Sequence, residues 1–156
     1  MKFIIYKNIM FTTFKIYNQE EENRRVEELM SYDVFNPLPE EELDELTKLV
    51  SIIYEAPISV IALVDRYRVL LKSNMGIEGC EIIKEIAFCN YTIKQDDVFI
   101  IEDATKDYRF RDNPFVLDFP WVRSYCGVPL VTPSGYNIGT LCFSYKKPRS
   151  VTENEK

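Results

Sequence analysis

The sequence predicts an α+β domain: an antiparallel sheet of five or six strands, with long helices on one face and a lid of loop and short helix on the other. Three observations predict it. Two helical patterns precede every strand pattern, and the strands are joined mostly by short connections, which favour antiparallel pairing. One long aromatic segment without helical or strand period lies between the last strands. The 156 residues suffice for one such domain.

Two helices are expected in the N-terminal third. The first spans Glu20–Tyr32 and is charged, with one apolar edge. The second is amphipathic, because apolar residues recur at three- and four-residue steps from Leu43 to about Glu55. Pro39 suits its first position, where a missing N–H has no helical partner to lose. Pro57 then ends it.

Five strands and one further helix follow. The first strand is almost continuously apolar, as in strands that are covered on both faces. The last two strands form a hairpin around a Pro-Ser-Gly turn. Pro129 cannot donate to a sheet ladder, so a bulge or an edge is expected there. The predicted strands are Ile58–Val64, Arg68–Asn74, Val98–Ile101, Val122–Val131 and Asn137–Tyr145, and the helix is Ile86–Ile93.

The aromatic segment Ala104–Trp121, called the lid segment below, is the most informative feature of the chain. It carries five aromatic residues, whereas disordered linkers are poor in them, and it is longer than most connections in compact domains. We therefore expect a packed cover over a ligand pocket. The alternative is a loop that only completes the core.

Composition excludes several classes of function. The net charge is −6, which argues against nucleic acid as a partner because binding phosphates needs clustered Lys and Arg. The chain has no histidine, which excludes a Ser-His or Cys-His catalytic pair and His-ligated metal or haem. No apolar run is long enough for a membrane helix, and neither a signal peptide nor the paired-cysteine spacing of a zinc site is visible. A cytoplasmic protein with four reduced cysteines is expected.

The order of motifs resembles a GAF domain of the bacterial signalling type. The resemblance covers about Glu22 to Thr152. It rests on Leu38–Leu49, Ile58–Asp65, Phe88-Cys89 with Thr92-Ile93, Ile101–Asp107, Arg109–Pro114, Tyr125–Leu130 and Gly135–Cys142. We divide the chain into an extension (1–19), the GAF-like sensor domain (20–152) and the start of a linker or helix to a possible output domain (153–156).

The resemblance implies a regulatory domain that is not itself an enzyme. It implies an unknown small-molecule ligand, a homodimer through flanking helices, and an output domain in cis such as a diguanylate cyclase or histidine kinase. No cofactor is expected. Bilin-binding relatives carry a Cys-His pair where this chain has Cys89-Asn90, and haem-binding relatives use a histidine.

Five residues are candidates for the ligand site, each with a structural alternative. Phe88, Phe110 and Tyr125 could form apolar pocket walls, although core packing would explain them nearly as well. Cys89 could be an activated thiol at a helix start, or a small buried apolar residue. Asp103 could bind a ligand amine, although organising a turn is the more common role of such a residue.

Other charged and sulfur-containing residues have local explanations. Arg109 and Arg123 could meet an anionic ligand, but we expect Arg109 to pair with a neighbouring aspartate. Cys126 and Cys142, on adjacent strands, could face each other, although packing explains them better than redox chemistry does. Two alternative functions remain open: a thiol-dependent redox enzyme similar to a sulfoxide reductase, with Cys89 at its centre, and a ligand-free dimerisation module.

Overall fold

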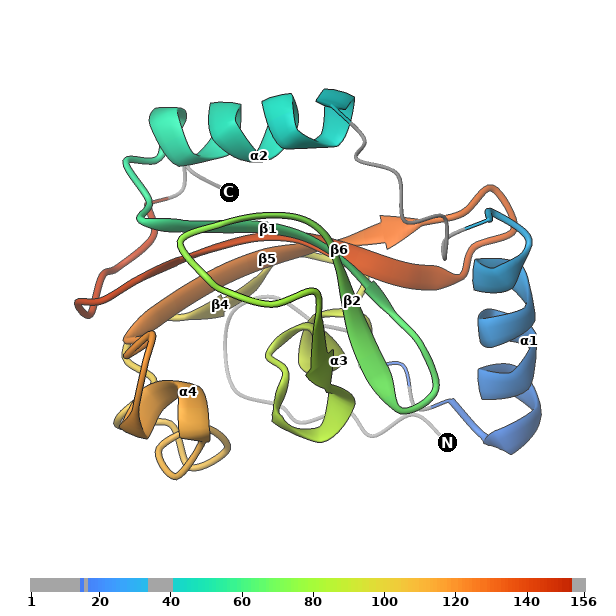
Figure 1. The fold of residues 1–156 in the computed structure, drawn as a ribbon. Coiled ribbons are helices and arrows are strands. Elements are labelled where there is room, and N and C mark those ends of the chain that lie inside the picture. Colours follow the sequence, from blue (N-terminus) through green and yellow to red (C-terminus); the bar gives the residue numbers. More distant parts are fainter. Residues whose placement is uncertain (1–14, 16, 34–40, 153–156) are drawn as a thin grey trace.

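The computed structural model describes residues 15, 17–33 and 41–152 (Figure 1). In chain order the elements are α1 (Gln19–Met30), α2 (Glu41–Ile53), β1 (Ile58–Val64), β2 (Arg68–Met75), β3 (Glu81–Ile83), the 3-10 helix η1 (Lys84–Ile86), α3 (Cys89–Thr92), β4 (Phe99–Ile101), α4 (Pro114–Leu117), β5 (Ser124–Val131) and β6 (Asn137–Tyr145). In this part of the chain no helix has the length and apolar character needed to cross a membrane.

The six strands form one sheet in the order β3-β2-β1-β6-β5-β4, and every neighbouring pair is antiparallel. The predicted sheet is thereby confirmed with six strands. All seven residues of β1 are buried, because both faces of this central strand are covered. The sequence prediction missed β3, a three-residue edge strand with alternating exposure.

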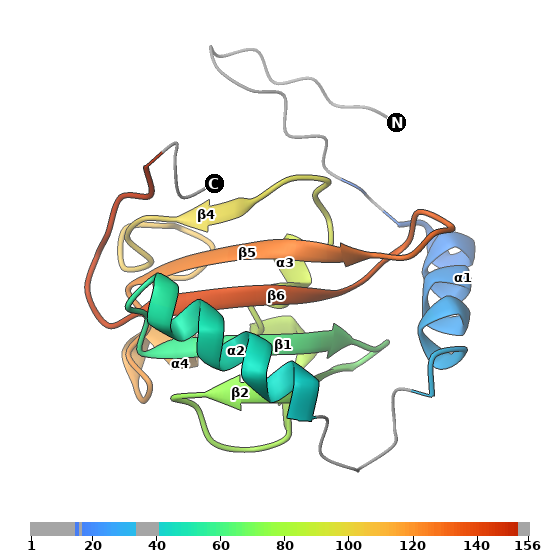
Figure 2. The same ribbon diagram turned by 90° about the horizontal axis from the view of Figure 1, so that it is seen from above.

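The helices form two layers around the sheet (Figures 1 and 2). Helix α2 lies across one face, whereas α3 and α4 lie on the other. Helix α1 lies beside the ends of the strands, and Leu29 on its inner side packs with Leu63 of β1 and Ile138 of β6. The two long helices therefore contact different parts of the sheet.

Helix α1 begins at a capping box. The Asn18 side chain accepts hydrogen bonds from the backbone N–H groups of Glu20 and Glu21, and the Glu21 carboxylate accepts one from the Asn18 N–H. This reciprocal pairing satisfies N–H groups that have no partner within the helix. The start of α1 thus agrees with the prediction to within one residue.

Helix α2 attaches to the sheet through polar contacts as well as apolar ones. The hydroxyl groups of Thr47 and Ser73 lie 2.7 Å apart, and the Ser73 hydroxyl donates to the Asp44 carboxylate. Thr47 is the one buried residue of the helix, while Leu46, Leu49 and Ile53 are about half exposed or more. The amphipathic pattern therefore identified the helix, but much of its apolar stripe faces away from the sheet. Pro39 lies outside the described residues.

Two predicted elements differ in detail. The helix expected over Ile86–Ile93 is instead η1 followed by the single turn α3. Strand β5 begins two residues later than predicted, and Pro129 lies beyond the last residue that β4 pairs with, Gly127. Its missing N–H therefore breaks no ladder bond on that side. The pairing of β5 with β6 also shifts register between Leu130 and Val131.

Candidate functional site

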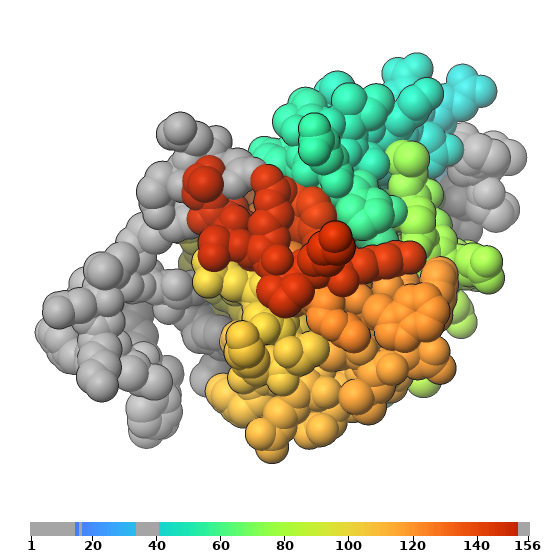
Figure 3. Space-filling view, turned by 90° about the vertical axis from the view of Figure 1, so that its left-hand side faces the viewer, coloured from blue at the N-terminus to red at the C-terminus, as the bar shows by residue number. Residues whose placement is uncertain are grey.

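The lid segment is an ordered cover with its own hydrogen bonds. Asn113 caps α4 by accepting from the Phe115 N–H at 2.9 Å, and its amide donates to the carbonyl of Ile86 at 2.8 Å. The Val122 N–H donates to the Phe115 carbonyl. Figure 3 shows the lid, yellow to orange, packed against the residues after β6, in red. The segment is therefore neither solvated nor splayed away from the sheet.

The five lid aromatics divide into two groups. Phe110 is fully buried and stacks on Phe88, with ring centroids 4.1 Å apart and planes 6° apart. Phe115 packs at the edge of the same cluster. Tyr108 is 82% exposed, and Phe119 and Trp121 are nearly half exposed. One aromatic ring of the lid therefore plugs the interior, while three lie at the surface.

The predicted aromatic wall is present, but it encloses little space. Phe88 stacks on both Phe110 and Tyr125, and the ring centroids of Phe88 and Tyr125 lie 5.1 Å apart. The cavity between these residues and the sheet measures about 50 Å³. Ligand pockets typically measure about 300–1,000 Å³, so this space has room for water but not for a metabolite. In this conformation Phe88, Phe110 and Tyr125 are core residues.

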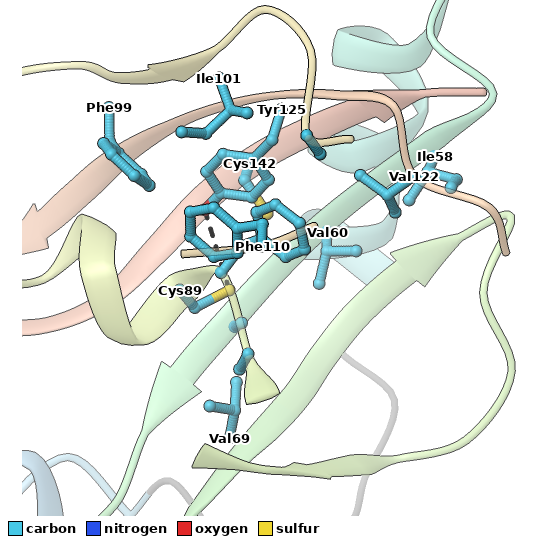
Figure 4. Close-up of a cluster of buried hydrophobic side chains, with 14 of the residues drawn as sticks. Ile58, Val60, Val69, Cys89, Phe99, Ile101, Phe110, Val122, Tyr125 and Cys142 are labelled. Carbon is cyan, nitrogen blue, oxygen red and sulfur yellow. Dashed lines mark hydrogen bonds between the residues drawn. The ribbon is translucent and has the colours of Figure 1, made fainter. Parts of the chain in front are cut away.

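A buried group of hydroxyls and thiols lies beside this small cavity. The hydroxyl groups of Thr92 and Tyr125 lie 2.7 Å apart. The Tyr125 hydroxyl also donates to the Cys89 sulfur at 4.0 Å (Figure 4). A hydrogen bond with Cys142 lowers the pKa of the Cys89 thiol to about 7, although burial opposes this. The same contact, together with burial, raises the pKa of Cys142 well above its ordinary value. Cys89 and Cys142 thus form the thiol pair of this interior.

Cys126 does not face Cys142. In the register of β5 and β6, Cys142 lies opposite Gly127 and Cys126 lies opposite Phe143. Cys142 belongs to the core cluster under the lid, and Cys126 to the cluster on the α2 side. Because side chains alternate between the faces of a sheet, the two thiols point in opposite directions. The alternative in which these two thiols face each other is therefore excluded, both pack in core clusters as expected, and the partner of Cys142 is Cys89.

Asp103 and Arg109 have local partners. The Asp103 carboxylate accepts from the N–H and hydroxyl of Thr105 at 3.1 and 2.6 Å and pairs with Lys106 at 3.0 Å. These contacts organise the turn that begins the lid segment. Arg109 pairs with Asp107 at 2.6 Å, as expected. Four of the five candidate residues thus gather in the core cluster that the lid segment covers, and Asp103 lies in the turn just before that segment.

A larger hollow, which we call the basic groove, lies outside the lid and was not predicted. It measures about 590 Å³ and lies between the start of α1, the β1–β2 turn and α3 with the residues after it. Its lining residues are Lys15, Tyr17, Gln19, Glu22, Arg66, Tyr67, Lys84, Glu85, Asn90, Ile93 and Lys94. These residues are spread along the chain without a local motif, so only the fold brings them together.

One wall of the basic groove is an ion cluster that attaches α1 to the sheet. The fully buried Arg25 donates to both carboxylate oxygens of Glu22, at 2.8 and 2.9 Å, and to the Val64 carbonyl at 2.6 Å. Lys84 donates to Glu22 at 2.7 Å. Burial alone would raise the pKa of Glu22, but these hydrogen bonds outweigh it and hold the pKa at about 2. Glu22 is therefore ionised near neutral pH.

The remaining charges of the basic groove are unevenly paired. Lys15 forms an ion pair with Asp96. The side chains of Arg66 and Lys94 form no ion pair with another residue that the structure describes, and Glu85 is the one further carboxylate of the lining. Burial, and then the positive charge of Lys84, lower the pKa of Lys94. The groove therefore gathers positive charge within an acidic chain. Elsewhere in the described residues, no cluster of three or more Cys, Asp or Glu side chains has the arrangement of a metal site.

Comparison with known proteins agrees with this architecture. A family model described as "GAF domain" matches residues 38–156. A cyclic di-GMP phosphodiesterase of Pseudomonas aeruginosa is 36% identical over 110 residues, which are 70% of this chain. The chain spans only 19% of the length of that relative.

Solved structures show the same fold. The GAF domain of a phosphoenolpyruvate-protein phosphotransferase from Acinetobacter superposes with a TM-score of 0.60 and 17% identity, over 90% of this chain and 85% of that one. A type II free methionine-R-sulfoxide reductase from Thermoplasma acidophilum superposes with a TM-score of 0.60 and 14% identity, over 74% of this chain and 79% of that one.

Proposed function

Since this chain belongs to the GAF domain family, we propose that it is the ligand-sensing regulatory domain of a bacterial signalling protein and controls an output domain in cis. The match to the phosphodiesterase supports this proposal most directly. The 36% identity is confined to a stretch that makes up only 19% of that protein, which leaves most of the enzyme outside the shared part. The shared part is thus one module of a larger enzyme. We infer an output domain that makes or degrades cyclic di-GMP, with a histidine kinase as the alternative.

The site under the lid requires a second, open conformation. Phe110 must leave its stack on Phe88 before a metabolite can enter. Truncation of a buried phenylalanine to alanine costs about 3–5 kcal/mol, and opening the lid has a cost of similar origin. A ligand that binds only the open state has a weaker apparent affinity than its intrinsic affinity, because only a small fraction of the molecules is open. The proposed site residues Phe88, Cys89, Asp103, Phe110 and Tyr125 act as a ligand site only in that state.

We further propose a homodimer through the flanking helices. Leu46, Leu49 and Ile53 follow the helical spacing i, i+3 and i+7, and all three are about half exposed or more. Beside them an apolar groove of about 270 Å³ lies between α2, strands β5 and β6, and Val98, which precedes β4. A second copy that covers this stripe would bury it, as in the cores of obligate dimer interfaces. A cytoplasmic location fits the four free cysteines.

Two measurements test the regulatory proposal. The purified 156-residue chain is incubated with cyclic di-GMP and Mg²⁺, and we expect no hydrolysis. A thermal-shift screen of metabolites and nucleotides then identifies a ligand, and we expect that ligand to change output activity in the full-length protein that contains this chain. Hydrolysis by the isolated chain, or a bound ligand without effect on the full-length protein, would refute the proposal.

One observation favours a second candidate, a thiol-dependent redox function. The lowered pKa of Cys89 and the adjacent Cys142 are features that a reactive thiol pair needs, and a sulfoxide reductase shares the fold. An assay of sulfoxide reduction with the Cys89→Ser variant decides this candidate. Unchanged activity in that variant, or no activity in the native chain, removes it.

A further inference from the structure

We propose that the basic groove is a second site, outside the lid, which binds a small molecule that carries a phosphate group. Its occupancy would act on the regulatory function proposed above, on which this second step rests. The groove measures about 590 Å³, within the usual range for small-molecule sites, whereas the space under the lid measures about 50 Å³. A ligand can enter the groove without displacing Phe110. The room available in this conformation is therefore outside the lid.

The charge of the groove selects an anion. Its lining includes four cationic side chains, of which Lys84 is held by Glu22 and Lys15 by Asp96. The side chains of Arg66 and Lys94 form no ion pair with another described residue. Glu85 is the one further carboxylate of the lining, so the groove keeps an excess of positive charge. This excess matches the charge of a phosphate, which is largely a dianion at neutral pH. A guanidinium and an ammonium group are also the side chains that most often bind phosphate oxygens.

The other lining residues favour an organic phosphate over the bare ion. The side-chain oxygen of Asn90 is buried and has no hydrogen-bond partner in the described structure, so it can accept a bond from a donor group of the ligand. Tyr17 and Tyr67 add aromatic surface, and Tyr67 is 75% exposed, free to cover a bound molecule. Such rings stack on planar groups, as they do on nucleobases. A mononucleotide combines these features.

The position of the groove connects its occupancy with α1. Gln19 and Glu22 of α1 line the groove together with Arg66 and Lys84. Lys84 already connects the residues before α3 to α1 by its bond to Glu22. A bound phosphate therefore competes with Glu22 for Lys84, and this contact differs between the free and bound states. Such a difference is what any ligand needs in order to shift a conformational equilibrium.

Calorimetric titration tests the proposal with AMP, adenosine and inorganic phosphate as probes. Arg66→Gln with Lys94→Gln removes the two cationic side chains of the lining that form no ion pair with a described residue. Lys106→Gln with Arg111→Gln is the matched control, because it removes the same charges from exposed positions in the lid segment. We expect AMP to bind more tightly than phosphate or adenosine. We also expect at least a tenfold weaker affinity in the groove variant, an unchanged affinity in the control, and weakening with added salt.

Each contrary result identifies what fails. Absence of AMP and phosphate binding, or equal weakening by the two double variants, overturns the groove proposal. Adenosine binding as tightly as AMP overturns the phosphate assignment. If AMP binds in the groove but leaves the output activity of the full-length protein unchanged, the groove proposal stands and the regulatory one fails. If another ligand controls the output activity equally well in the groove variant, the regulatory proposal stands and the groove proposal fails.

Discussion

Replacing Glu22 with glutamine should weaken the attachment of α1 to the sheet. The carboxylate of Glu22 is bonded by Arg25 and by Lys84 within 3 Å and is only 18% exposed. Its pKa falls from an ordinary value of 4.5 to about 2. At 1.36 kcal/mol per pKa unit this corresponds to about 3 kcal/mol in favour of the ionised form. Glutamine mimics the neutral form, so Glu22→Gln should lower the free energy of unfolding at pH 7 by about 2–3 kcal/mol.

The contribution of Glu22 to stability should also depend on pH in one direction. The folded-state pKa lies below the unfolded value, so the contribution of Glu22 is complete above about pH 4.5 and is lost as the pH falls towards 2. Urea unfolding between pH 7 and pH 2.5 should therefore show the difference between native chain and variant shrinking through this window. Glu20→Gln is the control, because the exposed pair of Glu20 with Arg24 should be worth less than about 0.5 kcal/mol. A difference that stays constant with pH, or equal losses in both variants, would refute the reasoning.

Three further predictions concern the interior and the surface. Phe110→Ala should lower the free energy of unfolding by about 3–5 kcal/mol, because it leaves a cavity beside Phe88. Benzene should fill this cavity and raise the melting temperature of the variant. A loss of stability as small as that of Tyr108→Ala, at an exposed position, would contradict the packing. In alkylation followed by mass spectrometry, the exposed Cys80 should react fast in the native chain and the three buried cysteines only after unfolding in urea; fast native modification of Cys89 would instead support the redox candidate. Leu49→Glu with Ile53→Glu should convert a dimer to a monomer in sedimentation analysis, and the melting temperature of the monomer should not fall. A dimer that persists in this variant would place the interface elsewhere.

Much of the fold could be predicted from local patterns. The continuous apolar run of β1 and the alternation in β6 determined their bounds to the residue, because both strands lie in the middle of the sheet. The edge strand β3 was not predicted, because three residues are too few for their alternation to be recognised as a strand pattern. In α2 the apolar spacing identified the helix correctly but not its orientation, which the bond between Thr47 and Ser73 helps to determine.

The candidate site was less accessible to sequence reasoning. The aromatic content of the lid segment indicated correctly that it packs, but residue type alone could not distinguish a ring that lines a pocket from one that fills it, as Phe110 does. The proximity of Cys89 and Cys142 depends on where α3 rests against β6. The basic groove depends on side chains from four separate segments. An excess of acidic residues in the composition concealed this local positive charge.

The central claim is that ligand occupancy at this domain is transmitted to α1. Amide hydrogen exchange tests it most directly, with and without the ligand that calorimetry identifies. A regulatory coupling of about 1–3 kcal/mol corresponds to a change of roughly 5- to 150-fold. We expect the exchange rates of α1 amides around Arg25 to change at least fivefold on binding, and this response to disappear in Glu22→Gln. Saturating ligand with unchanged exchange throughout α1 would contradict the claim.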